Sequence, residues 1–243
     1  MLELSMKNKY IIFLFTFFIS TNSFSQINII AGVAKSWANE DKKSFAGTLI
    51  KKITQTSSIK VTFQAKPLVR AVNGFVKKDY NCFFGGNKDD FQTYMDTNLL
   101  ISSDNVLQNH VRVLTLKKNR TINNIKDISN LRGSHINGMK NVIALNKRLP
   151  ELKNIINVKD ISQALEMIKR NRIDYIIHWS PLTKEFKDLL HFNNNLSLHA
   201  LQARMNCYKD SKTIEFIDDF NLQLKKLKKI DYVQKSYKSF LKR

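Results

Sequence analysis

The chain has 243 residues, with 40 Lys or Arg against 20 Asp or Glu, and its formal net charge is +20. Three Pro, seven Gly and an ordinary apolar content exclude a disordered chain and allow one large or two small packed domains. A basic protein attracts anions such as nucleic acid, acidic lipid headgroups, or a carboxylate or phosphate ligand. Compositional drift is the alternative, because Lys is spread along the chain and Asn and Ile are abundant. No nucleic-acid-binding module is recognisable, so no nucleic-acid partner is expected.

The first 25 residues have the three-part pattern of a secretory signal. Lys7 and Lys9 precede an apolar run of about ten residues, and Ser23-Phe24-Ser25 places small residues at a cleavage site. The run is shorter than the roughly 20 residues of a membrane span. We expect cleavage after Ser25 and a soluble periplasmic protein; an uncleaved N-terminal anchor is the alternative.

After residue 25, strands alternate with amphipathic helices, as is typical of a parallel α/β sheet. Phe45, Leu49 and Ile53 recur at helical spacing in the first helix. Pro67 opens the second helix, at a position where proline is tolerated. The predicted order is strand Ile27–Val33, helix Asp41–Gln55, strand Ile59–Gln64, helix Pro67–Lys77, strand Asn81–Phe84, a short apolar piece Leu99–Ser102 and strand Val111–Leu116.

A polar run after residue 116 separates this set from a second α/β set. The predicted divisions are a signal peptide at 1–25, lobe 1 at 26–117, lobe 2 at 118–203, and a return segment with C-terminal helices at 204–243. The elements expected in the second half are strand Ser134–Asn137, helix Lys140–Arg148, strand Asn154–Val158, helix Ile161–Arg170, strand Ile173–His178, a helix opened by Pro181, an extended return Leu196–Arg204, and tail helices Ser211–Lys229 and Tyr232–Leu241.

The two sets contain an internal echo. Residues Leu68 to Gly85 and Ile161 to His178 align at a constant offset of 93 positions, each as an amphipathic helix, a polar turn and an apolar strand. The echo predicts two α/β lobes with a ligand cleft between them.

Enzymatic and metal sites find little support. The chain lacks a G-x-S-x-G elbow and an H-E-x-x-H motif, and its five His are scattered without ligand spacing. Its two cysteines, Cys82 and Cys207, are too few for a thiolate zinc site. In an exported protein they can form a disulfide or stay as buried thiols, and the sequence leaves this open.

Several segments resemble one protein family. These are Pro67-Leu68-Val69-Arg70-Ala71, the run from Ile125 to Asn137 (IKDISNLRGSHIN), Ala164-Leu165 followed by Asn171-Arg172-Ile173-Asp174, and Phe220-Asn221-Leu222-Gln223-Leu224. Their order and spacing resemble the type II periplasmic solute-binding proteins, specifically the extracellular solute-binding family 3. The resemblance implies a two-lobed α/β fold with a helical tail, no catalytic activity and no cofactor. It also implies a monomer that binds a small solute, which an anionic group would suit, and delivers it to an inner-membrane ABC-type transporter. A periplasmic module that senses the ligand for a membrane signalling protein is the first alternative, and a secreted enzyme of unrecognised type is the second.

The chain departs from the family pattern where amino-acid ligands are held. Family members usually carry an Arg after the third strand for the ligand carboxylate, and the matching stretch Asn87-Lys88-Asp89-Asp90-Phe91 has none. The Asp that often holds the ligand amine is replaced near His178-Trp179. Binding of an amino acid is therefore in doubt.

Ligands of such folds sit outside the carboxyl ends of parallel strands, and this rule selects the candidate ligand-binding residues. Trp37 can stack on a flat ligand, and glycines after the third strand let backbone N–H groups approach it. Arg70 can pair with a carboxylate, and a helix opening at Gly138 can receive an anion. Ordinary packing, turns and solvated faces are the competing explanations. The full set is Trp37, Arg70, Phe84, Gly86, Asn87, Gly138, Met139, His178 and Trp179.

Overall fold

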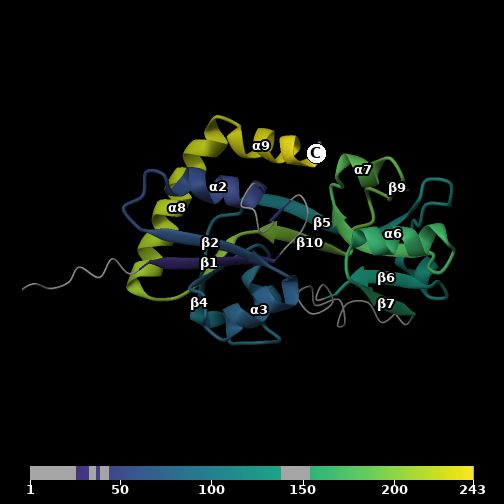
Figure 1. The fold of residues 1–243 in the computed structure, drawn as a ribbon, viewed down its shortest axis with the longest axis horizontal. Helices are drawn as coiled ribbons and strands as arrows, with labels where there is room; N and C mark the ends of the chain where they lie inside the picture. Colours follow the sequence, from purple (N-terminus) through teal and green to yellow (C-terminus); the bar gives the residue numbers. More distant parts are fainter. Residues whose placement is uncertain (1–25, 33–36, 39–43, 138–153, 243) are drawn as a thin grey trace, which may run out of the picture.

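The computed structural model describes residues 26–32, 37–38, 44–137 and 154–242. They form two mixed α/β sheets, each flanked by helices and arranged as two lobes side by side (Figure 1). This confirms the predicted two-lobed α/β architecture with C-terminal helices. The predicted signal peptide and the predicted helix Lys140–Arg148 lie outside the described residues.

The first sheet has the strand order β2-β1-β3-β11-β4. Its strands β1, β2 and β3 are parallel, whereas β11 runs antiparallel to both β3 and β4. The bounds are β1 Ile27–Gly32, β2 Val61–Lys66, β3 Cys82–Phe84, β4 Leu100–Ser102 and β11 Met205–Tyr208.

Helices cover both faces of the first sheet (Figure 1). Helices α2 (Phe45–Thr54), α8 (Ser211–Lys229) and α9 (Tyr232–Leu241) pack on one face, around Ile27, Ile29 and Phe84. Helix α3 (Leu68–Val76) packs on the other face against Ile30 and Phe83. The short helices η2 (Lys88–Phe91) and η3 (Thr97–Leu99) join β3 to β4.

The second sheet has the order β10-β5-β8-β6-β7, and β9 also pairs with β5. Strands β7, β6 and β8 are parallel, and β5 is antiparallel to β8 and β10. The bounds of its elements are β5 Leu107–Leu116, η4 Ile125–Ile128, β6 Gly133–Ile136, β7 Ile155–Val158, α6 Ile161–Lys169, β8 Tyr175–Ser180, α7 Lys184–Lys187, β9 Leu190–His191 and β10 His199–Ala203.

The chain passes between the sheets twice. Residues 103–106 link β4 to β5, and Arg204 links β10 to β11. These crossing segments are bonded together: the Ser103 amide donates to the Met205 carbonyl, the Val106 amide to the Ala203 carbonyl, and the Arg204 guanidinium to the Ser103 carbonyl (2.8, 2.8 and 2.7 Å). Strand β5, which the sequence placed in lobe 1, pairs with β8 and β10 in the second sheet. The boundary at residue 117 itself stays a prediction.

The sequence echo corresponds to a structural repeat. Lys78 and Asn171, equivalent at the 93-residue offset, both follow a helix with a left-handed backbone, at φ 64° and 56°. The next amide in each copy donates back to the helix, Asp79 to Gly74 and Arg172 to Met167. The same helix-ending motif therefore turns α3 into β3 and α6 into β8.

The two cysteines meet across neighbouring strands. Cys82 of β3 lies opposite Cys207 of β11, with Cα atoms 4.0 Å apart, and the two form a disulfide. Both are completely buried. The sequence left this bridge open because the pairing depends on the register of an antiparallel return strand.

Candidate functional site

The carboxyl ends of the parallel strands in both sheets lie beside the crossing segments. In lobe 1, the Gly85 amide just after β3 donates to the carbonyl of Arg204 (2.9 Å). In lobe 2, Ser180 at the end of β8 lies opposite His110, near the start of β5. The strand ends that the ligand-placement rule selects therefore face the junction between the lobes.

On the lobe 1 side of this junction, three aromatic rings pack together. The ring of Trp37 stacks on Phe84 (centroids 5.1 Å apart, planes at 26°) and contacts Phe45 (5.3 Å). Phe84 is fully buried, whereas Trp37 is only half-buried. Trp37 is thus the member of the stack that keeps a face toward solvent, and Phe84 supports it from behind.

Two glycines directly follow Phe84 in the chain. Gly85 and Gly86 have φ of 127° and 73°, in the region that side chains rarely adopt. A Cβ on Gly85 would lie 3.5 Å from the indole nitrogen of Trp37. The turn after β3 therefore lies against the half-buried tryptophan, with its backbone hydrogen-bonded to Arg204 and Asn206.

The side chain of Asn87 is already engaged. Its Oδ1 accepts from the backbone N–H of Gln202 in β10 (3.1 Å), and the backbone N–H of Asn87 donates to the Asp90 carboxylate (2.8 Å). The same carboxylate lies 3.3 Å from Nε2 of His199 on β10. This cluster ties the turn after β3 to the strand that leads back from lobe 2, and it occupies the stretch where the family pattern has its arginine.

Arg70 lies in the first turn of α3 and is exposed. It follows Pro67 at the carboxyl end of β2, so it lies at the same edge of the sheet as the glycine turn. Its guanidinium is accessible to an anionic group.

The lobe 2 side presents His178 and Trp179 at the end of β8. Both are half-buried, and their rings lie 5.0 Å apart. Burial lowers the pKa of His178 to about 4, although a hydrogen bond to the Trp179 carbonyl (2.8 Å) opposes the shift. The imidazole is therefore neutral near pH 7, with Nδ1–H donating to that carbonyl. Trp179 also packs against the Val111 and Ile177 cluster.

A buried arginine that sequence reasoning missed supports this strand. Arg112 of β5 donates from Nε to the Ser180 hydroxyl (2.9 Å) and from Nη1 to the carbonyls of Asn193, Asn194 and Leu196 (3.1, 2.7 and 3.0 Å). Burial lowers its pKa. These partners are backbone carbonyls from a loop 81 to 84 residues away, so no sequence motif could reveal them.

The structure brings some of the predicted site residues together and places others apart. Trp37, Phe84 and the glycine turn come together, His178 and Trp179 lie at the lobe 2 strand end, and Arg70 lies at the lobe 1 edge. Gly138 and Met139 lie outside the described residues. Among the described residues, no group of His, Cys, Asp and Glu is arranged to hold a metal ion, and no helix is long and apolar enough to cross a membrane.

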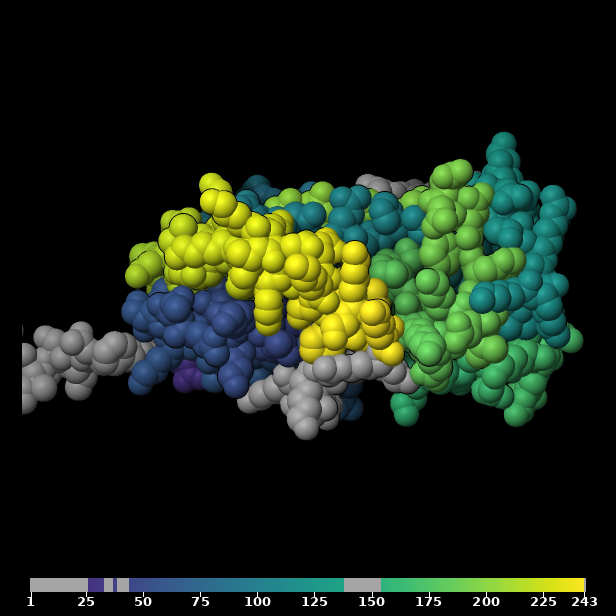
Figure 2. Space-filling model, turned by 90° about the horizontal axis from the view of Figure 1, so that it is seen from above, coloured from purple at the N-terminus to yellow at the C-terminus, as the bar shows by residue number. Residues whose placement is uncertain are grey.

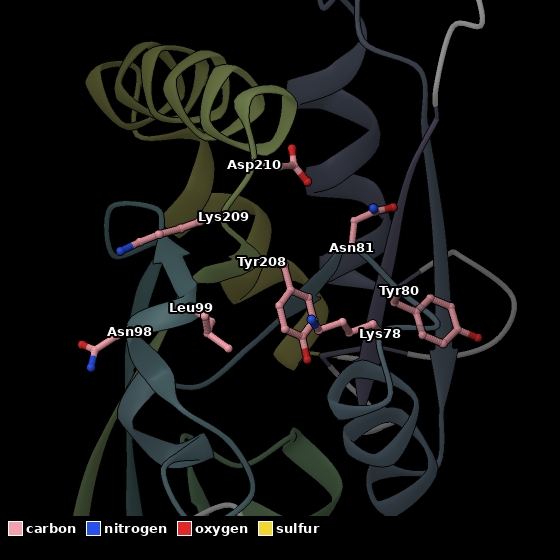
Figure 3. A pocket seen from close by; sticks show the side chains of 8 residues that line it. All are labelled: Lys78, Tyr80, Asn81, Asn98, Leu99, Tyr208, Lys209 and Asp210. Atoms are coloured by element: carbon pink, nitrogen blue, oxygen red, sulfur yellow. The ribbon is translucent and has the colours of Figure 1, made fainter.

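A cavity of about 400 Å³ lies elsewhere in lobe 1 (Figure 3). It is bounded by residues before β3 and β4 and after β11, which is the sheet end opposite the junction. Its polar groups are largely engaged: the Tyr208 hydroxyl donates to the Phe75 carbonyl (2.9 Å), and the Lys78 ammonium lies over the Tyr208 ring (5.2 Å). We place the candidate site at the junction because ligands of parallel α/β sheets bind at the carboxyl strand ends.

Comparison with known proteins identifies the fold. No protein-family model and no curated protein matches the chain by sequence. The ancestral amino acid-binding protein AncCDT-1, a precursor of cyclohexadienyl dehydratase, is similar with a TM-score of 0.67 and 16% identity, over 89% of this chain and 96% of that chain. The GluR0 ligand-binding core from Nostoc punctiforme, in complex with (L)-glutamate, is similar with a TM-score of 0.70 and 13% identity, over 88% and 98%.

The substrate-binding protein of an amino acid ABC transporter is similar with a TM-score of 0.66 and 14% identity, over 90% of this chain and 100% of that chain. These neighbours are mainly binding proteins. The likeness shows that this chain has the two-lobed type II periplasmic-binding fold, and it confirms the resemblance to family 3 at the level of the fold.

Proposed function

We propose that this protein is an exported solute-binding protein of the family 3 type. It binds a small solute between its two lobes and delivers it to an inner-membrane ABC transporter. The observation that carries the proposal is that the carboxyl strand ends of both sheets meet at two crossing segments, because such a junction allows lobes to close around a ligand by a hinge motion. We propose no enzymatic activity and no cofactor.

The residues at the junction favour a flat or apolar ligand group. Trp37 offers an aromatic face backed by Phe84. Gly85 lies beside its indole, whereas Gly86 is buried with its carbonyl accepting from Asn206 (3.1 Å) and acts through the turn. On the other lobe, Trp179 and the neutral His178 supply a second aromatic surface. Phe84 is fully buried and acts through Trp37, and Asn87 acts through the turn that it holds.

An anionic group on the ligand would find Arg70 and, in lobe 2, the helix start at Gly138 and Met139 that the sequence predicts. The neighbours include proteins that bind amino acids, yet this chain has no arginine in the stretch 87–91. We therefore do not assign an amino-acid ligand. A small carboxylate or phosphate compound with a planar part suits the proposed residue set.

Export is supported by the disulfide. Structural disulfides form in oxidising compartments such as the periplasm and are rare in the cytosol. The buried Cys82–Cys207 bridge therefore agrees with a signal peptide at residues 1–25 and a periplasmic protein. We propose that the mature protein is a monomer.

A second function is favoured by one neighbour. The fold is shared with the GluR0 ligand-binding core, a module that binds (L)-glutamate. A periplasmic module that presents its bound state to a membrane signalling protein is thus the alternative to transport. A permease gene beside this one would favour transport, and a kinase or cyclase gene would favour sensing.

The test of binding is a thermal-shift screen against a metabolite panel that includes amino acids, carboxylates and phosphorylated compounds. A ligand at 100 times its Kd stabilises the folded protein by about 2.7 kcal/mol, which raises the Tm by roughly 5–10 °C for a chain of this size. Both tryptophans of the chain lie at the junction, so intrinsic fluorescence titration provides a second readout.

Trp37→Ala should abolish the shift, and Tyr80→Phe, at the cavity on the opposite end of lobe 1, should preserve it. Each variant is first checked by circular dichroism to be folded. A folded wild-type protein that shows neither a thermal shift nor a fluorescence change with any compound would overturn the proposal.

A further inference from the structure

The C-terminal helices carry a dense set of positive charges. From residue 225 to residue 242 the sequence has seven lysines and a single acidic residue, Asp231. All seven lysines are exposed. Although lysines occur along the whole chain, these seven lie close together on two neighbouring helices.

Six of these lysines lie on outward faces. In α8 the buried side chains are Phe220, Leu224 and Leu227, and in α9 they are Val233 and Tyr237. With 3.6 residues per turn, the lysines fall about half a turn from those buried positions. We call this set the basic ridge; it consists of Lys225, Lys226, Lys229, Lys235, Lys238 and Lys242.

The ridge is open to solvent. Figure 2 shows α9 and the end of α8 (yellow) as one continuous raised surface with no other segment lying over it. The two helices pack against each other, and α9 also packs on α2 through Phe45 and Tyr237 (5.1 Å). The helices are thus held firmly on lobe 1 while their lysines face outward.

Apolar side chains project from the same surface. Ile230, in the turn between α8 and α9, is 65% exposed, and Leu222, one helical turn before Lys225 and Lys226, is 53% exposed. Ile230 directly follows Lys228 and Lys229. An exposed apolar side chain flanked by lysines is the composition of a surface that rests on a lipid interface.

Helix stability explains only part of the charge. Lysines in the last turn of a helix interact favourably with its dipole, and this accounts for Lys226 and Lys229 of α8. Lys235 lies in the first turn of α9, at the end where a positive charge is unfavourable. No described acidic side chain forms an ion pair with Lys235. Interaction with the helix dipole therefore does not account for Lys235.

We propose that the basic ridge docks on a membrane surface rich in anionic phospholipid. The lysines would meet the phosphate-bearing headgroups, and Ile230 would insert at the acyl boundary. A lipid surface is favoured over nucleic acid or an acidic protein because the surface is raised and predominantly positive, and because the apolar side chain of Ile230 projects from it.

The test is cosedimentation of the full protein with vesicles, after secretion by an expression host. Mixed phosphatidylglycerol–phosphatidylcholine vesicles are compared with pure phosphatidylcholine vesicles. Each set is measured at about 0.1 M and about 1 M NaCl, where the screening length falls from about 10 Å to about 3 Å. We expect binding to the anionic vesicles at low salt only.

The decisive variant replaces four ridge lysines for which no bonded partner is described: Lys225→Gln, Lys229→Gln, Lys235→Gln and Lys238→Gln. Each lysine near an anionic surface strengthens binding by about fivefold, so we expect the loss of four lysines to lower the vesicle affinity by up to several hundredfold. The matched control removes four exposed lysines of lobe 2, as Lys117→Gln, Lys126→Gln, Lys159→Gln and Lys187→Gln, and should retain nearly all binding.

Ile230→Ser should reduce binding severalfold and leave its salt dependence unchanged. Circular dichroism and thermal melts confirm that each variant is folded. Two results would overturn the proposal. One is that the wild-type protein does not bind anionic vesicles at low salt. The other is that the lobe 2 control loses as much affinity as the ridge variant, since the overall net charge would then suffice.

Discussion

We expect the disulfide between Cys82 and Cys207 to stabilise this protein more than any other contact that a pair of substitutions can remove. The bridge joins residues 125 positions apart and closes a ring that contains the whole second sheet. In the chain-entropy description, closing a ring of this length removes unfolded-state freedom worth about 5 kcal/mol. Measured losses in native proteins are typically about 2–5 kcal/mol.

The perturbation is the double variant Cys82→Ala, Cys207→Ala, compared with the oxidised wild-type protein. For a chain of this size, a loss of about 2–5 kcal/mol corresponds to a fall in Tm of roughly 5–20 °C. Guanidinium unfolding, followed by tryptophan fluorescence, measures the same loss independently as a lower midpoint. The slope of the transition also changes, because the reduced unfolded chain is less compact.

A reductant separates loss of the bridge from loss of the sulfur atoms. Because both cysteines are fully buried, the folded wild-type protein should resist a thiol reductant under native conditions and yield to it once unfolded. Reductant should lower the unfolding midpoint of the wild-type protein and leave that of the double variant unchanged. Equal midpoints for the oxidised wild-type protein and the double variant would refute the reasoning.

Three further substitutions probe lobe 2 by thermal and urea unfolding. His178→Asn should flatten the pH dependence of stability. In the wild-type protein the pKa of His178 is about 4 when folded and near 6.5 when unfolded, so the chain takes up a proton on unfolding. The wild-type protein therefore loses up to roughly 1–3 kcal/mol of stability as the pH falls from about 6.5 to 4. An unchanged pH profile would contradict this. Gly133→Ala should destabilise severely, by about 3 kcal/mol or more, because its Cβ would lie 2.2 Å from Cζ of the buried Tyr175 ring; a Tm within 2–3 °C of wild type would be a failure. Tyr175→Phe should be neutral or stabilising by up to about 1 kcal/mol, because the buried hydroxyl has no hydrogen-bond partner among the residues that the structure describes; a loss above that size would show that it has another partner.

The sequence predicted the repeating elements well because their signals are local. Helices α3 and α6 bury the residues that the spacing selects, including Ala71 and Phe75 in one and Ala164 and Ile168 in the other. The strand after α6 begins and ends two residues later than predicted, at Tyr175 and Ser180. Its extension is fixed by antiparallel pairing with β5, which no local pattern reveals.

Long-range pairing also explains what the sequence could not supply at the site. The candidate set came from strand ends, so it included Asn87 without showing that Gln202 and Asp90 engage it. It missed Arg112 because that side chain is held by carbonyl groups of a distant loop. Residue types and spacing identify an edge of a sheet, whereas the partners of each side chain depend on how the return strands are threaded.

The internal repeat gives a physical reason for the asymmetry of the candidate site. Asn81 and its equivalent Asp174 make the same hydrogen bond. Each side chain accepts from a backbone N–H at or just before the start of the neighbouring strand, that of Asn28 beside Asn81 (2.9 Å) and that of Arg132 beside Asp174 (2.8 Å). With the strands fixed in the same way, the positions that follow are also equivalent. Lobe 1 places Gly85 and Gly86 where lobe 2 places His178 and Trp179.

The two lobes therefore offer different chemistry on a common backbone. In lobe 1 the aromatic ring beside Gly85 is Trp37, which comes from another strand end. The positive φ of 127°, rather than a lack of space, favours glycine at position 85, because a Cβ there would make only an ordinary contact with the indole. In lobe 2 the equivalent residues carry the aromatic rings themselves, over a strand whose end is braced by Arg112. A ligand between the lobes would meet aromatic groups from both. In lobe 2 these are His178 and Trp179, which belong to the repeat, and in lobe 1 it is Trp37, which lies outside the repeat.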